Sequence, residues 1–217
     1  MAIRILIADD HGVIRRAVGC MLSSEAGMEL VGEAQDGKVA VQLARELKPD
    51  IILMDVDMPN LNGIEATRQI VHELPNVRVI GFSPRLDRRT VREMLKAGAS
   101  GYVPKQSDSQ ELVTAIRTVA SNQTYLSSIV AGIVVEGCIN PSTWDENSAY
   151  SVLTARGREV LQLIAEGKST KAIANLLHVS TKTVEWHRKQ IMNKLGIQSI
   201  AGLVKCAIRE GLTSVHV

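Results

Sequence analysis

The stretch from Ile51 to Pro59 constrains the fold more than any other part of the sequence. Its first four residues are apolar without interruption, and the carboxylate of Asp55 follows them directly. An unbroken apolar run of this length is typical of a parallel strand that is buried on both faces. Open α/β sheets bind their ligands at the carboxyl ends of such strands, so we expect Asp55 to lie at a functional edge.

Strand-like runs alternate with helix-like spacing over the first 120 residues. Val39, Leu43 and Leu47, for example, repeat at the interval of one helix face. This alternation predicts βαβ units and therefore an α/β fold, a doubly wound five-stranded parallel sheet with helices on both faces. The expected strands are Ile3 to Ala8, Leu30 to Ala34, Ile51 to Met54, Val77 to Phe82 and Gly101 to Val103.

The pattern changes after residue 120. Asn122 to Leu126 is typical of a turn, Ser128 to Glu136 of a short apolar helix, and Asn140 to Ser151 of a polar linker. Helical spacing then returns in four short segments, which predict a small all-α domain. These segments are Ala155 to Glu166, Thr170 to Leu177, Thr181 to Leu195 and Ile200 to Glu210, with Gly167 and Gly196 at expected C-terminal caps.

These patterns predict a domain at residues 1–120, a linker with a short helix at 121–150 and a second domain at 151–217. The charge differs between the two ends of the chain: residues 1–150 contain 15 Lys and Arg against 19 Asp and Glu, whereas residues 151–217 contain 10 against 4. A compact basic end suggests a nucleic-acid partner for the second domain alone.

The sequence has neither a membrane-spanning apolar run nor a signal-like segment at its start, so we expect a cytoplasmic protein without a membrane partner. The three cysteines are Cys20, Cys138 and Cys206. They are widely spaced and form no CxxC pair, so a disulfide framework or a zinc site is not expected. We interpret them as buried, reduced thiols.

Polar residues follow four of the predicted strands. Asp9 and Asp10 follow the first, Asp55 the third, Ser83 the fourth and Lys105 the fifth. Because parallel strands point the same way, these side chains should converge at one edge. Crowded carboxylates repel unless a cation is present, and hard oxygen ligands suit Mg²⁺.

With a metal in place, Asp55 could stay ionised and attack a phosphoryl group as a nucleophile. Lys105 would pair with the new negative charge, and the hydroxyl of Ser83 would hydrogen-bond a phosphoryl oxygen. Single acids at such positions often only cap helices, but four converging strand ends favour a site. His11 follows the acid pair and is interpreted as a non-ligand, because Mg²⁺ prefers oxygen.

Three motifs resemble the receiver domain of bacterial two-component response regulators. They are Ala8-Asp9-Asp10-His11, Met54-Asp55-Val56-Asp57-Met58-Pro59 and Ala97-Gly98-Ala99-Ser100-Gly101-Tyr102-Val103-Pro104-Lys105. The resemblance implies a flavodoxin-like receiver in residues 1–120 with Asp55 as the phospho-acceptor. It also implies Mg²⁺ binding by Asp9, Asp10, Asp55 and the backbone carbonyl of Asp57. Ser83 and Tyr102 would form the switch pair, with Tyr102 rotating inward on phosphorylation.

Pro84 departs from this family pattern. In the family, the backbone N–H of the residue after the Ser or Thr donates to the phosphoryl group, and proline has no N–H. The loss of one charge-assisted hydrogen bond, worth about 1.5 to 3 kcal/mol, predicts a damped phospho-switch.

In the basic end, Thr170 to Leu177 and Thr181 to Leu195 flank a short turn and are typical of a helix-turn-helix. Val184, Ile191 and Leu195 share one face of the second helix and are predicted core residues. The opposite face and its flanks offer side chains to a major groove and to phosphates. The candidate DNA-binding residues are Lys182, Glu185, Trp186, Arg188, Lys189 and Asn193, with Lys194 as a further phosphate contact. A solvated face with a Glu185–Lys189 pair is the alternative, against which an exposed Trp186 argues.

Six segments resemble the LuxR/NarL-type DNA-binding domain. They are Leu153-Thr154-Ala155-Arg156, Glu159-Val160-Leu161, Ile173-Ala174, Val179-Ser180, Thr183-Val184-Glu185-Trp186-His187 and Lys194-Leu195-Gly196-Ile197. The resemblance implies that Glu185, Trp186 and Lys189 face bases and that Ile200 to Glu210 forms a dimer seam. The apolar stripe of that last helix is equally typical of a core-facing helix.

The first two helices of this domain depart from the family's capping box. Gly157 stands three residues after the capping residue Thr154, and Ala172 stands three residues after the capping residue Ser169. The family has Glu at both of these positions. Each cap keeps its hydroxyl but loses the reciprocal carboxylate, and Gly157 adds a helix-propensity cost of about 1 kcal/mol. The pattern predicts a second domain that is less stable than its relatives.

Together these features predict a response regulator that is not an enzyme beyond its own phosphotransfer. A histidine kinase would phosphorylate Asp55 with Mg²⁺ as cofactor, and a homodimer would bind double-stranded DNA. Two alternatives stay open: a phosphohydrolase, for which Asp57 could serve as general acid, and a constitutive DNA-binding regulator with a degenerate receiver, for which Pro84 argues.

Overall fold

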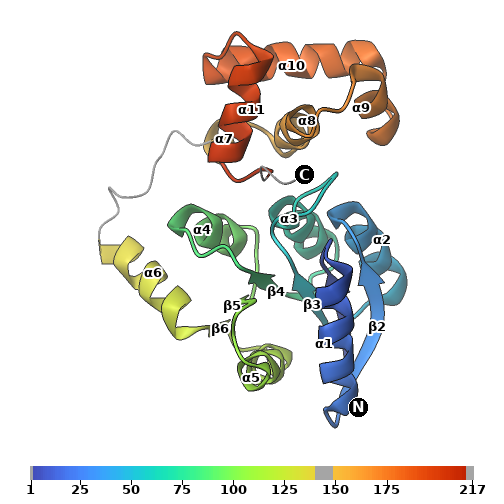
Figure 1. Ribbon diagram of the computed structural model, residues 1–217, viewed down its shortest axis with the longest axis vertical. Helices are drawn as coiled ribbons and strands as arrows, with labels where there is room; N and C mark the ends of the chain where they lie inside the picture. The colour runs from blue at the N-terminus through green and yellow to red at the C-terminus, as the bar shows by residue number, and fades with distance from the viewer. Residues whose placement is uncertain (1, 140–148, 214–217) are drawn as a thin grey trace. The chain divides into compact units, whose positions relative to one another are not determined.

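The computed structural model describes residues 2–139 and 149–213, which fall into two compact units. Residues 2–139 form the first unit, and residues 149–213 form the second (Figure 1). Among the described residues, no helix combines the length and the apolar character needed to cross a membrane.

A parallel sheet of six strands forms the centre of the first unit, in the order β2-β1-β3-β4-β5-β6. The strands are β1 (Ile3–Ala8), β2 (Met28–Ala34), β3 (Ile51–Met54), β4 (Arg78–Ser83), β5 (Gly101–Pro104) and β6 (Tyr125–Leu126). Helices α1 (Gly12–Ser24) and α5 (Ser109–Ala120) cover one face, and α2 (Gly37–Leu47), α3 (Gly63–Glu73) and α4 (Arg88–Lys96) cover the other (Figure 1). The arrangement confirms the predicted doubly wound α/β fold.

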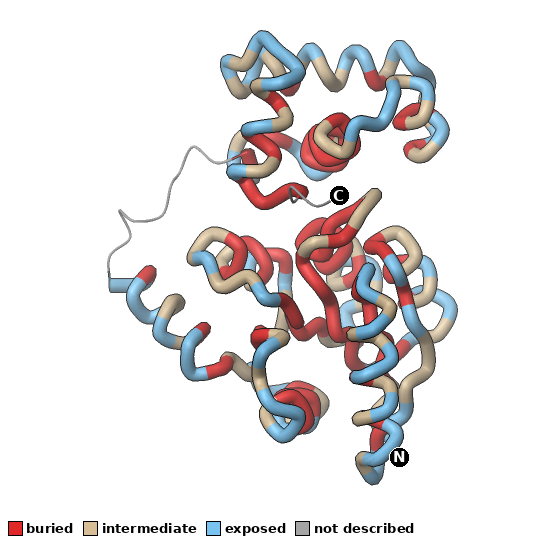
Figure 2. Tube along the Cα trace, in the orientation of Figure 1, coloured by how far each residue is buried: buried red, intermediate tan, exposed pale blue. Residues whose placement is uncertain are grey.

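β3 explains why the apolar run of the sequence is unbroken. It pairs with β1 on one side and β4 on the other, and all four of its residues are fully buried. Ile51 and Leu53 pack toward Val18 and Leu22 of α1 and Ile116 of α5. Because helices cover both faces of the sheet, neither side of β3 meets water (Figure 2).

The sheet has one strand more than the sequence predicted. Tyr125 and Leu126, expected to lie in a turn, pair in parallel with Gly101 and Tyr102 of β5 as strand β6. The turn is shorter than expected, with its left-handed residue at Asn122. Two residues are too few to show a strand period, and the open edge of β5 supplied the partner that the sequence pattern could not reveal.

Helix α6 (Ser128–Ile139) follows β6 and packs against α4 in the first unit. An ion pair between Arg88 of α4 and Glu136 of α6 joins the two helices. The predicted apolar helix is therefore present, three residues longer than expected.

Five helices form the second unit: α7 (Ala149–Val152), α8 (Ala155–Ala165), α9 (Thr170–Leu176), α10 (Thr181–Leu195) and α11 (Ile200–Arg209). The last four match the predicted helices, which confirms the helical second part of the fold. The expected polar linker reached residue 151, but residues 149–152 are helical. At the start of this helix the backbone N–H of Ala149 donates to Glu210 Oε2 at 2.9 Å. The rest of that linker, residues 140–148, lies outside the described residues.

The helix caps follow the sequence closely. The hydroxyls of Thr154, Ser169, Ser180 and Ser199 each accept a hydrogen bond from the backbone N–H three residues later. Gly196 caps α10 with φ 66°, and Gly167, with φ 74°, follows the last turn of α8. Both glycines occupy the left-handed region that favours glycine after a helix.

The cysteines are a correction to the sequence interpretation. All three are free thiols, but only Cys206 is buried, whereas Cys20 and Cys138 are exposed. Cys20 lies on α1 away from Val18 and Leu22, the residues that this helix turns toward the sheet. Composition alone could not reveal which helix face each thiol occupies.

Candidate functional site

Asp55 is fixed by the backbone around it. Its N–H donates to the carbonyl of Ala8 at 2.8 Å, and the N–H of Gly63 donates to the carbonyl of Val56 at 2.9 Å. A Cβ on Gly63 would lie 1.8 Å from the carbonyl oxygen of Asp55, so only glycine allows this approach of α3 to the end of β3. Sequence reasoning missed this role of Gly63.

Strand ends bring three predicted residues into direct contact. Lys105 Nζ, after β5, lies 2.7 Å from Asp9 Oδ2 and 2.7 Å from Asp55 Oδ2, after β1 and β3. Both carboxyl side chains are buried, and Ser83 at the end of β4 is fully buried as well. The sheet thus gathers these side chains at one edge, as parallel topology requires.

The negative charges of the carboxylates in this cluster are only partly offset by the ammonium group of Lys105. Burial raises the pKa of Asp55 from 3.8 to about 6, Lys105 opposes that rise, and Asp9 adds to it by repulsion. Burial alone would lower the pKa of Lys105, but Asp55 and Asp9 together raise it, so the ammonium stays charged. The cluster therefore carries more negative charge than one lysine can offset.

Asp10 and His11 extend the cluster toward solvent. His11 Nδ1 lies 2.7 Å from Asp10 Oδ1, and the backbone N–H of His11 donates to Asp9 Oδ1 at 2.8 Å. One ligand atom from each of Asp9, Asp10, His11 and Asp55 lies within 4.8 Å of the others. Three carboxylates, one of which (Asp55) has a raised pKa, are a donor set that fits a hard divalent cation such as Mg²⁺.

Asp57 and Arg85 form a contact that the sequence did not predict. Arg85 Nη1 lies 3.1 Å from Asp57 Oδ1, and Arg85 Nε lies 3.3 Å from Asp87 Oδ2. The ion pair joins the loop after β3 to the loop after β4. The only hint in the sequence is a cation two residues after Ser83, beside Pro84.

Tyr102 is buried beside the same loop. Its hydroxyl donates to the backbone carbonyl of Arg85, and burial raises its pKa. Gly81 makes room for the ring, because a Cβ there would lie 2.8 Å from Tyr102 Cδ2. The next N–H after Pro84, that of Arg85, donates to Ser83 Oγ over 3.4 Å. Ser83 and Tyr102 thus both contact the backbone of Arg85.

Helix α10 presents the second group of predicted residues. Val184 and Ile191 are buried and Leu195 is half-buried, so this face packs inward as expected. Arg188 is half-buried, and the other candidates are exposed: Lys182, Glu185, Trp186, Lys189 and Asn193. Trp186 is 58% exposed, and its ring meets that of His187 edge to face at 4.9 Å.

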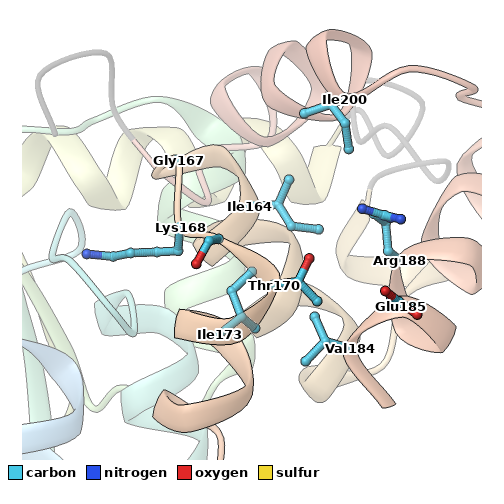
Figure 3. A pocket seen from close by; sticks show the side chains of 10 residues that line it. Ile164, Gly167, Lys168, Thr170, Ile173, Val184, Glu185, Arg188 and Ile200 are labelled. Carbon is cyan, nitrogen blue, oxygen red and sulfur yellow. The ribbon is translucent and has the colours of Figure 1, made fainter. Parts of the chain in front are cut away.

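A hollow of about 230 Å³ lies within the second unit, between α8, α9 and α10 and the start of α11 (Figure 3). Its apolar lining consists of Ile164, Ile173, Val184 and Ile200. Glu185 and Arg188 border it from α10. A second hollow of about 290 Å³ borders Trp186. Both place charged or aromatic side chains of α10 beside open surface.

Comparison with protein families gives two matches. Residues 5–117 match the response regulator receiver domain, and residues 151–207 match the bacterial regulatory proteins of the luxR family.

Single proteins match as well. Oxygen regulatory protein NreC of Staphylococcus epidermidis is 37% identical over 214 residues, covering 96% of this chain and 98% of NreC. The crystal structure of a LuxR-family two-component response regulator from Aurantimonas sp. matches with a TM-score of 0.61 at 34% identity, over 64% of this chain and 99% of that chain. A structure of two RcsB dimers bound to two parallel DNAs matches with a TM-score of 0.58 over 95% of this chain and 98% of that one, and at 23% identity it supports the fold alone.

Proposed function

Because the chain belongs to the two-component response regulators with a receiver and a LuxR-type DNA-binding domain, we propose that phosphoryl transfer to Asp55 controls DNA binding by α10. Regulators of this family bind DNA and are not enzymes in the usual sense. The contact of Lys105 Nζ with both Asp9 and Asp55, 2.7 Å from each, is the observation that carries the proposal. We assign the receiver to residues 1–120, the linker to 121–150 and the DNA-binding domain to 151–217.

In the proposed reaction, a carboxylate oxygen of Asp55 attacks the phosphorus of a phosphohistidine on a sensor kinase. The new O–P bond forms as the N–P bond breaks, and the electron pair stays on the imidazole nitrogen, which then takes up a proton. Lys105 is already in place to pair with the transferred group, and Ser83 offers its hydroxyl from the neighbouring strand end.

Mg²⁺ fits the donor set and would be held by Asp9, Asp10 and Asp55 with the backbone carbonyl of Asp57. When bound, it would neutralise the charge that develops on the phosphoryl oxygens. The raised pKa of Asp55 supports a cation at this place, since a positive charge beside a buried carboxylate favours its ionised form.

The switch would act through Ser83 and Tyr102. Tyr102 is already fully buried with its hydroxyl on the Arg85 carbonyl, which is the inward position that the family resemblance implies for the phosphorylated state. Phosphorylation would then stabilise an arrangement that the chain can adopt without it. Such a population shift needs only contacts that the phosphoryl group makes in one of two packings.

On DNA, the exposed side chains of α10 would enter the major groove. The residues that would face the bases are Lys182, Glu185, Trp186 and Lys189. The residues that would lie at the edge of the groove, near the phosphates, are Arg188, Asn193 and Lys194. α11 supports dimerisation: Leu203 and Ala207 are buried, whereas Ile200 is 45% exposed and shares a surface stripe with the half-buried Val204 and Ile208. Two such domains would read half-sites about 34 to 36 Å apart. DNA as partner implies action in the cytoplasm.

Operator selection tests the proposal on the wild type and on Asp55→Ala, each with and without acetyl phosphate and Mg²⁺. We expect the phosphodonor to tighten binding of the wild type to its selected operator and to leave Asp55→Ala unchanged. If Asp55→Ala responds like the wild type, the switch at Asp55 is wrong. Equal, tight binding by all four samples would instead favour the constitutive regulator for which Pro84 argues.

A further inference from the structure

Pro84 leaves the phosphoryl site of the proposed function one donor short. Its nitrogen carries no hydrogen, and the next backbone N–H, that of Arg85, is engaged by Ser83 Oγ over 3.4 Å. The backbone of this loop therefore offers no donor to a group on Asp55 at the position after Ser83. A side chain would have to supply it.

Arg85 has the position and the chemistry to do so. Its guanidinium reaches from the loop after β4 to Asp57, two residues beyond Asp55, with Nη1 at 3.1 Å from Asp57 Oδ1. Nε contacts Asp87, and among the described residues Nη2 makes no hydrogen bond. The side chain is 25% exposed, so it is not locked in a packed core. A planar guanidinium binds phosphate oxygens at least as well as it binds a carboxylate.

We propose that Arg85 is a phosphoryl-binding residue of this receiver, whose guanidinium leaves Asp57 for the phosphoryl group on Asp55 and replaces the donor lost at Pro84. This inference rests on the proposed phosphorylation of Asp55. The added charge of a phosphoryl group, close to two negative charges, makes it the stronger partner for the guanidinium.

The movement of Arg85 from Asp57 to the phosphoryl group would also couple phosphoryl binding to the switch pair Ser83 and Tyr102. The backbone carbonyl of Arg85 accepts the hydrogen bond of the buried Tyr102 hydroxyl, and its N–H contacts Ser83. Movement of the Arg85 side chain would therefore act on a residue whose backbone contacts both members of the switch pair. If Arg85 supplies the missing donor, it would offset the weakening of the phospho-switch that Pro84 alone predicts.

A double-mutant cycle tests the inference. Calorimetric titration of the full chain with beryllofluoride and Mg²⁺, a mimic of the phosphoryl group, is compared for the wild type, Arg85→Ala, Pro84→Ala and the double variant. We expect Arg85→Ala to weaken binding at least about ten-fold, the loss of one charge-assisted bond. The same change in the Pro84→Ala background should cost less than about three-fold, because the restored N–H already supplies the donor. Pro84→Ala alone should change the affinity little.

Two controls keep the outcomes separate. Arg45→Ala breaks another arginine–carboxylate pair of the first unit, with Glu73 at 2.6 Å, and should leave the affinity unchanged. Arg85→Lys keeps the charge without the planar fork and should retain part of the affinity. Equal losses from Arg85→Ala in both backgrounds, no loss, or tighter binding would each overturn the role of Arg85. Absence of beryllofluoride binding by the wild type would instead refute phosphorylation of Asp55 itself.

Discussion

The acidic edge of the sheet and the exposed face of α10 are built in opposite ways. The acidic edge collects Asp9, Asp55 and Lys105 from three separate strand ends and buries two carboxylates beside one ammonium. The face of α10 takes its side chains from consecutive turns of a single helix and leaves most of them exposed. The first site exists only when the sheet is folded, whereas the second is defined wherever the helix forms.

This difference separates function from stability in the second unit and couples them in the first. Substitutions at the acidic edge should alter the packing and the charge balance that hold the sheet together. Substitutions on the outer face of α10 should alter binding with little effect on folding, since surface changes usually stay within about 0.5 kcal/mol.

Gly63→Ala should give the largest effect, because the new Cβ would stand 1.8 Å from the carbonyl oxygen of Asp55. We expect the free energy of unfolding of the first unit to fall by about 3 kcal/mol or more, the upper range for overpacking. Chemical denaturation followed by circular dichroism measures this. Gly132→Ala on α6 is the matched control, since its Cβ meets no atom within 4 Å and should cost nothing. A Gly63→Ala protein as stable as this control would show that α3 can shift freely.

Asp55→Asn should stabilise the first unit at pH 8 by about 3 kcal/mol, because the pKa of Asp55 is raised by roughly two units and each unit corresponds to about 1.4 kcal/mol. A carboxyl whose pKa is raised to about 6 in the folded state contributes stability below its unfolded pKa of 3.8 and loses it as the pH rises through 6. The advantage of Asn should therefore shrink as the pH falls from 8 to 4.

Denaturation of the wild type and Asp55→Asn across this pH range, without divalent metal, checks the sign. Addition of Mg²⁺ should stabilise the wild type more than the variant. A difference between the two proteins that does not depend on pH would mean that burial of Asp55 is not the cause.

Lys189→Ala should weaken specific DNA binding by about five- to thirty-fold, or about 1 to 2 kcal/mol, if Lys189 contacts base edges. Its free energy of unfolding should stay within about 0.5 kcal/mol of the wild type, because the side chain is exposed. Fluorescence anisotropy on the selected operator provides the affinity. Lys205→Ala, an exposed lysine of α11 with no assigned DNA contact, should bind like the wild type. Equal losses for both lysines would indicate a general charge effect.

Gly157→Glu should have the smallest effect, a gain of about 1 kcal/mol in the stability of the second unit from helix propensity and a completed capping box. Thr154 already accepts the hydrogen bond from the Gly157 N–H at 3.1 Å, so only the reciprocal carboxylate is missing. The new Cβ would lie 3.3 Å from Thr154 Oγ1, a close contact that a small shift of the Thr154 side chain would relieve. Thermal unfolding that shows no gain would contradict the predicted weakness of this cap.

The local features of the chain could be read from its sequence. Apolar runs and helical spacing predicted every strand but the two-residue β6, and the caps at Thr154, Ser169 and Gly196 stand where their residue types place them. The exposed face of α10 followed from its period alone. These features depend on residues within one or two turns of each other, so the sequence determines them directly.

Only the tertiary structure decided which distant residues meet. It set the approach of Gly63 to Asp55, the room that Gly81 leaves for Tyr102 and the ion pair between Arg85 and Asp57. Each of these contacts joins separate loops or strands, and its distance depends on the twist and register of the whole sheet. The sequence by itself determined that Asp55 ends a buried strand, and the packing around it decided which groups would share its site.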